Sequence, residues 1–88
     1  MDSIIILFSS STSAVRMKDA LTRKGFSAKV ISTPSRLAEG GCGYSVKTES
    51  RAAAEAKKII DTIGMRSRGI YLDTLSEGKD RYRKLPLA

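Results

Sequence analysis

The only cysteine of the chain lies in a run of glycines, Gly40-Gly41-Cys42-Gly43, and it is the residue best suited to do chemistry. Glycine has no Cβ, so its backbone adopts conformations closed to other residues and lets a second molecule approach closely. A thiol in this setting is accessible, and its thiolate form is a nucleophile. The competing interpretation is a tight turn around a small buried residue, because free cysteines are among the most buried residue types.

The composition limits the chemistry that Cys42 can take part in. The 88 residues include one cysteine and no histidine. A single cysteine forms no internal disulfide and supplies too few thiolates for a zinc or iron–sulfur site, so we expect no metal and no cofactor. Without histidine, the Ser-His and Cys-His catalytic pairs are excluded.

The charge and the apolar runs indicate the kind of partner and the compartment. Lysine and arginine number 16 against 9 aspartates and glutamates, which favours an acidic partner such as nucleic acid, an acidic protein face or an anionic ligand. The apolar run at 4–8 is too short for a signal peptide and follows Asp2, where a basic residue would be typical. No run approaches the length of a membrane span. We therefore expect a cytoplasmic protein with no membrane partner and a reduced thiol.

Hydrophobic patterns predict six elements in the order strand, helix, strand, strand, helix, strand. The predicted strands cover residues 4–8, 26–31, 42–48 and 70–75, and the predicted helices cover 13–24 and 51–63, the second capped by Ser50. Each helix carries an apolar stripe at helical spacing. The stripes are Ala14, Met17, Ala20 and Leu21, then Ala52, Ala53, Ala56, Ile59, Ile60 and Ile63.

This order of elements in a short chain is typical of an α+β, ferredoxin-like βαββαβ sandwich. Two helices would cover one face of a four-stranded antiparallel sheet, and each helical crossover would skip one strand. We expect a single domain over residues 1–75. Residues 76–88 look like a flexible, basic C-terminal tail, unless Tyr82 and Leu85 pack or bind a partner.

The predicted topology gathers distant segments at one edge of the sheet. The end of the first strand, the start of the first helix and the long loop before the third strand meet there, which brings Cys42 close to a cluster of hydroxyl residues. That cluster is Ser9, Ser10, Ser11 and Thr12, and the arginines within reach are Arg36, Arg66 and Arg68. Positive charge and a helix N-terminus lower the pKa of a thiol, and the same groups would hold an anion.

Several segments together carry a family resemblance. They are Ile4-Ile5-Ile6-Leu7-Phe8, Ser9-Ser10-Ser11-Thr12, Ser32-Thr33-Pro34-Ser35-Arg36, Gly41-Cys42-Gly43 and Ile70-Tyr71. In these motifs and their order, residues 3–75 resemble a family of small bacterial proteins, the selenium/sulfur carrier-like family. The family usually has small or hydroxyl residues before Cys-Gly, and this chain has Gly40 and Gly41 there instead.

The resemblance implies a carrier that holds a persulfide, or selenium, on Cys42. The donor would be an enzyme such as a cysteine desulfurase, and the sequence does not name the acceptor. Gly41 and Gly43 would let a donor loop approach, and Arg36 and the start of the first helix would stabilise the anionic sulfur. Thr33 joins the hydroxyl cluster as a binding residue. One cysteine suffices for such a role, so the resemblance favours a non-enzymatic carrier over a true catalyst.

Two other interpretations stay open, and in both Cys42 has no catalytic part. Net charge and fold are compatible with a nucleic-acid-binding module, although Phe8 and Tyr44 are far fewer aromatics than RNA-recognition modules use. An anion-binding module would hold phosphate on the hydroxyl cluster at a helix N-terminus. The simpler role of that cluster is to cap the helix.

Overall fold

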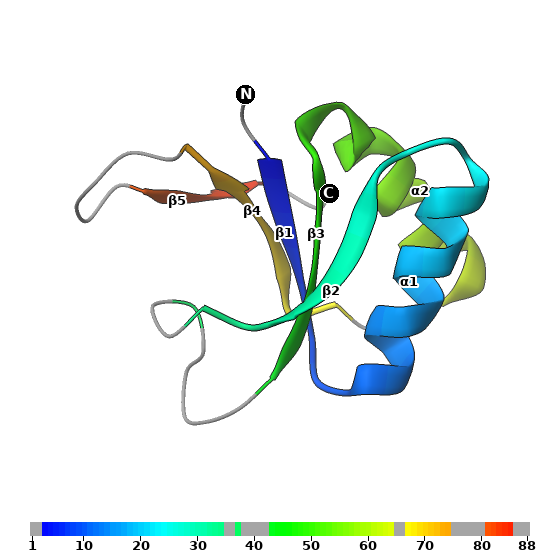
Figure 1. The fold of residues 1–88 in the computed structure, drawn as a ribbon, viewed down its shortest axis with the longest axis horizontal. Coiled ribbons are helices and arrows are strands. Elements are labelled where there is room, and N and C mark those ends of the chain that lie inside the picture. Colours follow the sequence, from blue (N-terminus) through cyan, green and yellow to red (C-terminus); the bar gives the residue numbers. More distant parts are fainter. Residues whose placement is uncertain (1–2, 35–36, 38–42, 65–66, 75–80, 86–88) are drawn as a thin grey trace.

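A five-stranded antiparallel sheet with both helices on one face forms the fold seen in a computed structural model (Figure 1). The structure describes residues 3–34, 37, 43–64, 67–74 and 81–85. The elements are β1 (Ser3–Phe8), α1 (Ser11–Arg23), β2 (Ala28–Ser32), β3 (Tyr44–Glu49), the 3-10 helix η1 (Ser50–Ala52), α2 (Ala53–Ile63), β4 (Gly69–Asp73) and β5 (Tyr82–Leu85). The strands lie in the order β2-β3-β1-β4-β5.

β1 is the middle strand of the sheet, and both of its edges are paired. β3 lies along one edge and β4 along the other, each antiparallel to β1. Residues Ile4 to Phe8 are all buried, as a continuous run of β-branched and large apolar residues predicts for a central strand. β3 separates β1 from β2, and β1 separates β3 from β4, so each helical connection passes over one strand.

The hydrophobic core lies between the two helices and the sheet. Its buried members from the strands are Ile4, Ile6, Phe8, Val46 and Ile70, and those from the helical segments are Ala14, Met17, Leu21, Ala52, Ala56 and Ile59. The predicted stripes are therefore confirmed in their central positions. Ile63 is the exception, with 46% of its surface exposed at the last position of α2. Within the described segments, neither helix is long and apolar enough to cross a membrane.

Two element boundaries differ from the predictions because side chains take over backbone hydrogen bonds. α1 begins at Ser11, two residues early, since the Ser10 side chain accepts from the backbone N–H of Ser13 and caps the helix. β2 begins at Ala28, two residues late. The backbone of Ser27 is held by side chains instead, with its N–H donating to Glu49 and its carbonyl accepting from the Thr48 hydroxyl.

The second helical segment also begins differently from the prediction. Ser50 is the first residue of η1 and not the cap of α2. Glu49 holds the cap position of η1 without a side-chain capping bond. Its carboxylate is turned to Arg51 and to Ser27. β3 continues to Glu49, one residue beyond the predicted end, while its predicted start at Cys42 lies outside the described residues.

The prediction of four strands is wrong, because β5 extends the sheet along the free edge of β4. Asp73 of β4 is only 1% exposed, and a buried carboxylate needs charged or hydrogen-bonding partners. Arg81, just before β5, supplies two bonds to it, from Nε at 3.0 Å and from Nη2 at 3.4 Å. Hydrogen bonding to Asp73 raises the pKa of Arg81. Tyr82 and Leu85, the two residues for which packing was left open, are half-buried.

Candidate functional site

The end of β1 leads directly into the hydroxyl cluster that starts α1. Ser10 Oγ accepts from the Ser13 backbone N–H at 3.2 Å and lies 3.1 Å from Ser13 Oγ. Ser9, Ser11 and Thr12 are exposed at the same end. The first turn of α1 contains no acidic residue, so its N–H groups and the positive end of the helix dipole are not neutralised there. Ser10 is a structural cap, and its neighbours face solvent.

Gly43 is packed against this end of β1 with less room for a Cβ than most residues have. A Cβ built on Gly43 would lie 3.1 Å from Thr33 Oγ1 and 3.3 Å from the carbonyl oxygen of Phe8. The Gly43 carbonyl also accepts from the backbone N–H of Thr33 at 3.0 Å. A side chain at this position would therefore require its neighbours to shift by a few tenths of an ångström, and glycine avoids that shift. The residue that follows Cys42 in the chain is thereby fixed beside Phe8, whose next residue is Ser9.

A buried pair of hydroxyls holds Thr33 in place. Thr33 Oγ1 and Ser45 Oγ are 2.7 Å apart, and Ser45 is fully buried in β3. A buried hydroxyl that finds a partner avoids the cost of desolvation, so the pair fixes how the segment after β2 meets the start of β3. Thr33 therefore serves the local architecture through both its backbone and its side chain.

The segment before β4 reaches the same end of β1 from the other side. The carbonyl of Leu7 accepts from the backbone N–H of Arg68 at 2.8 Å and from the Ser67 hydroxyl at 3.0 Å. Arg68 is exposed. One of the arginines predicted at this edge is therefore present there through its backbone.

The structure brings together two of the predicted site residues that it describes. Gly43 lies against Thr33 and the Phe8 carbonyl at the end of β1, and the hydroxyl cluster follows Phe8 directly in the chain. Cys42, Gly41 and Arg36 lie outside the described residues, so the predicted lowering of the thiol pKa stays a prediction. The described part of the chain contains no group of three or more cysteine, aspartate and glutamate residues placed to hold a metal ion.

Two serines that the sequence does not mark as functional organise this end of the sheet. Ser45 and Ser67 were not singled out, although one bonds to Thr33 and the other to the Leu7 carbonyl. Ser45 occupies a small polar position between Tyr44 and Val46 in a predicted strand. Alternation places Ser45 on the sheet face opposite Val46, which the sequence does not show to be buried. In the structure Ser45 is buried on that face.

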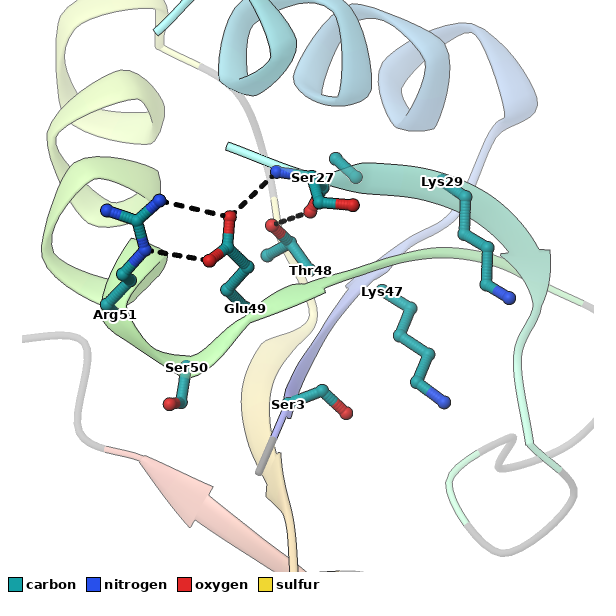
Figure 2. Close-up of a pocket in the computed structure, with 9 residues that line it drawn as sticks. Ser3, Ser27, Lys29, Lys47, Thr48, Glu49, Ser50 and Arg51 are labelled. Atoms are coloured by element: carbon teal, nitrogen blue, oxygen red, sulfur yellow. Dashed lines mark hydrogen bonds and ion pairs between the residues drawn. The ribbon is translucent and has the colours of Figure 1, made fainter. Parts of the chain in front are cut away.

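A cavity of about 510 Å³ opens at the other end of the sheet, on β2, β3 and the start of η1 (Figure 2). It is lined by Ser3, Ser27, Ala28, Lys29, Lys47, Thr48, Glu49, Ser50 and Arg51. Arg51 lies 2.7 Å from Glu49 through Nε and stands over the Phe26 ring. The hydrogen bond from Arg51, followed by that from the Ser27 N–H, lowers the pKa of Glu49, and the same pairing raises the pKa of Arg51.

A match to a protein family includes the end of β1 where Gly43 lies. Residues 3–72 match the family described as "Putative Se/S carrier protein-like". Neither the curated proteins nor the solved structures contain a match to the chain. The matched stretch covers β1 through most of β4 and includes every predicted site residue. The chain therefore belongs to the Se/S carrier protein-like family.

Proposed function

We propose that the protein carries sulfur, or selenium, as a persulfide or its selenium counterpart on Cys42, and delivers it to an acceptor. Family membership supports a carrier of these elements. The chain offers a single cysteine for the task, in a setting of glycines. We propose a cytoplasmic location, where a carrier thiol stays reduced between loading steps.

The observation that carries the proposal is the close packing of Gly43 against Thr33 and the Phe8 carbonyl. The backbone adjoining Cys42 is thereby anchored at the end of β1, where α1 begins. A carrier cysteine must be presented to two different partners in turn. An anchored backbone next to a run of glycines suits that need, because it limits the search without adding side chains that obstruct a donor.

The proposed transfer conserves atoms and electrons. The Cys42 thiolate attacks the terminal sulfur of a donor persulfide, a new S–S bond forms at Cys42, and the donor S–S bond breaks. The donor cysteine leaves as a thiolate, so no external oxidant or reductant takes part. An acceptor nucleophile then attacks the terminal sulfur, and Cys42 is released as a thiolate. Selenium would follow the same course.

Positive groups around the end of β1 would favour the anionic forms of Cys42. The N-terminal turn of α1 carries no acidic residue, and Arg68, whose backbone N–H donates to the Leu7 carbonyl near the end of β1, is exposed. Each of these stabilises a negative charge placed nearby. Arg36 remains a proposed contributor from the loop before β3.

Mass spectrometry after loading tests the proposal directly. The protein is incubated with a cysteine desulfurase and either cysteine or selenocysteine, and the intact mass is measured without reductant. We expect one added sulfur or selenium atom that reductant removes, and none on Cys42→Ser. An unmodified wild-type protein, or a Cys42→Ser variant that gains the same mass, would contradict a carrier role.

The rate of alkylation against pH gives an independent measurement. We expect the pKa of the Cys42 thiol to lie below about 8.5, the value of a free cysteine. Arg68→Gln should raise that pKa, whereas Lys58→Gln on α2 removes a charge on the helical layer and should leave it unchanged. A thiol that alkylates only after unfolding would identify Cys42 as a buried core residue.

For the fold class, we propose that β1 to β4 with α1 and α2 form a ferredoxin-like unit, to which β5 is an addition. The order of these four strands and the passage of each helical connection over one strand support this assignment.

A further inference from the structure

Two lysines lie directly opposite each other in the sheet, on neighbouring strands at the level of Ile5 in β1. Lys29 of β2 and Lys47 of β3 are register partners in an antiparallel pair. Like charges at directly opposed positions destabilise a sheet, because their side chains share one face at close range. Neither lysine forms an ion pair with any residue that the structure describes.

Both lysines stand on the sheet face opposite the helices. Their neighbours Val30 and Val46 pack toward the helical core, so alternation turns Lys29 and Lys47 the other way. Figure 2 shows the two side chains extending in the same direction along one side of the cavity. Both lysines therefore line the same cavity, and a ligand bound there would contact both ammonium groups.

The acidic residue of this cavity does not neutralise the lysines. Both carboxylate oxygens of Glu49 are engaged, by Arg51 at 2.7 and 3.4 Å and by the Ser27 N–H at 2.9 Å. The other polar groups along the cavity are the hydroxyls of Ser3, Ser27, Thr48 and Ser50, of which that of Thr48 donates to the Ser27 carbonyl. Ser50 is also the first residue of η1, which has no side-chain cap. The cavity thus combines hydrogen-bond donors with two cations that have no ion-pair partner in the described part of the chain.

We propose that this cavity binds a phosphate group between Lys29 and Lys47. Two ammonium groups match the charge of a phosphate dianion, and the hydroxyls of Ser3 and Ser50 can donate to its oxygens. A volume of about 510 Å³ exceeds what one phosphate fills and lies in the range of small-molecule sites. The cavity therefore has room for a larger molecule: a phosphorylated small molecule would supply the dianion, whereas a nucleic-acid strand would supply singly charged phosphodiesters to the two lysines.

The phosphate cavity is separate from the proposed carrier site. Ser3 lines it at the start of β1, whereas Gly43 lies against Phe8 at the end of that strand. The lysine pair lies at the level of Ile5, three residues from Phe8, which is about 10 Å along the strand at about 3.4 Å per residue. Phosphate binding and sulfur loading are accordingly independent properties, and Cys42→Ser should leave the first unchanged.

Thermal unfolding at fixed ionic strength tests the site. Pyrophosphate is titrated against sodium chloride of equal ionic strength, so that general screening of a basic protein cancels. We expect pyrophosphate to raise Tm in the wild type and to lose about tenfold in affinity in Lys29→Gln and in Lys47→Gln. Lys58→Gln, on α2, is the matched control and should respond like the wild type. An equal response in all four proteins would overturn the proposal.

The ligand-free proteins provide a second readout that an unfolded variant cannot imitate. Because the lysines repel each other, Lys47→Gln should unfold at the same or a higher Tm than the wild type without phosphate, at low salt. A lower Tm, with Lys58→Gln unchanged, would show that Lys47 has a structural role and would count against the site.

Amide NMR shifts locate the binding and identify the source of the phosphate. Pyrophosphate and a short single-stranded RNA are added separately, and shifts are expected at Lys29, Lys47 and Ser50. Either probe acting there supports the phosphate site, and the more effective one indicates the class of ligand. Shifts confined to Ser11 and Thr12, or no shift with either probe, would overturn it.

Discussion

The two ends of β1 are built from different chemistry. At the Phe8 end, polar groups have partners: Thr33 bonds to Ser45, and Ser10 caps α1 through Ser13. Toward the Ser3 end, at the level of Ile5, Lys29 and Lys47 face each other without an ion-pair partner among the described residues. Neutral hydroxyls and a close-packed glycine shape the first end, while net charge shapes the second.

The two regions therefore differ in what shapes them: hydrogen bonds hold the backbone at the Phe8 end, and like charges oppose each other at the lysine pair. Short, satisfied hydrogen bonds fix a backbone in one position, which is what the presentation of a reactive residue requires. Opposed cations do the reverse, since they cost stability until an anion arrives. We expect substitutions at the Phe8 end to lower the free energy of unfolding, and substitutions of the lysines to change ligand response instead.

Gly43→Val should have the largest effect. The new side chain would begin 3.1 Å from Thr33 Oγ1 and 3.3 Å from the Phe8 carbonyl oxygen, so these neighbours would have to shift by a few tenths of an ångström, and the two added methyl groups need further room. We expect a loss of about 1–3 kcal/mol in the free energy of unfolding, as for other overpacked positions. Urea unfolding measures it.

The control for Gly43→Val is Ala54→Val, which adds two methyl groups at an exposed position of α2. It should change stability by less than about 0.5 kcal/mol. Gly43→Ala should fall between the wild type and Gly43→Val. Equal stabilities for the wild type and Gly43→Val would mean that the end of β1 is not tightly packed.

Thr33→Val should have the next largest effect, because it leaves the buried Ser45 hydroxyl without its partner. An unsatisfied buried hydroxyl costs about 1–2 kcal/mol. The double variant Thr33→Val/Ser45→Ala removes both hydroxyls and should recover part of the loss, which a double-mutant cycle of unfolding free energies measures. Strictly additive losses would show that the two hydroxyls do not interact.

Ser10→Ala separates capping from ligand binding in the hydroxyl cluster. Loss of the bond to the Ser13 N–H should cost about 1 kcal/mol of stability. Ser11→Ala, one residue later, removes an exposed hydroxyl and should cost much less. If Ser10→Ala instead unfolds like the wild type but loads sulfur poorly, the cluster acts on the cargo and not on the helix.

The sequence was sufficient for the core of the fold because apolar spacing reports burial. The run from Ile4 to Phe8 and the stripes of both helices predicted the central strand and the helical layer. β5 was not predictable in this way. It has few apolar residues, and its attachment depends on the buried Asp73 and on Arg81, eight positions away, which no local pattern connects.

The candidate site was predictable to the level of which segments meet. Strand order brought the hydroxyl cluster, Thr33 and Gly43 together, and the glycine run marked a close approach. The partners Ser45 and Ser67 escaped notice because a buried serine and an exposed one look the same in sequence. The lysine pair escaped for a related reason, since cross-strand register cannot be read from either strand alone.

The pH dependence of stability gives the smallest expected effect, at the Ser3 end. The pKa of Glu49 lies below 4.5 in the folded protein, first because of the Arg51 hydrogen bond and then because of the Ser27 N–H. A lowered carboxyl pKa adds stability above the unfolded pKa, and that stability is lost as pH falls through the folded value. The free energy of unfolding of Glu49→Gln should therefore differ from that of the wild type at neutral pH and approach it in acid.

Arg51→Gln should reduce the same pH dependence only in part, since the Ser27 N–H still donates to Glu49. Unfolding curves from neutral to acid pH measure this, and a Glu49→Gln profile parallel to that of the wild type would show that the pair contributes nothing to stability.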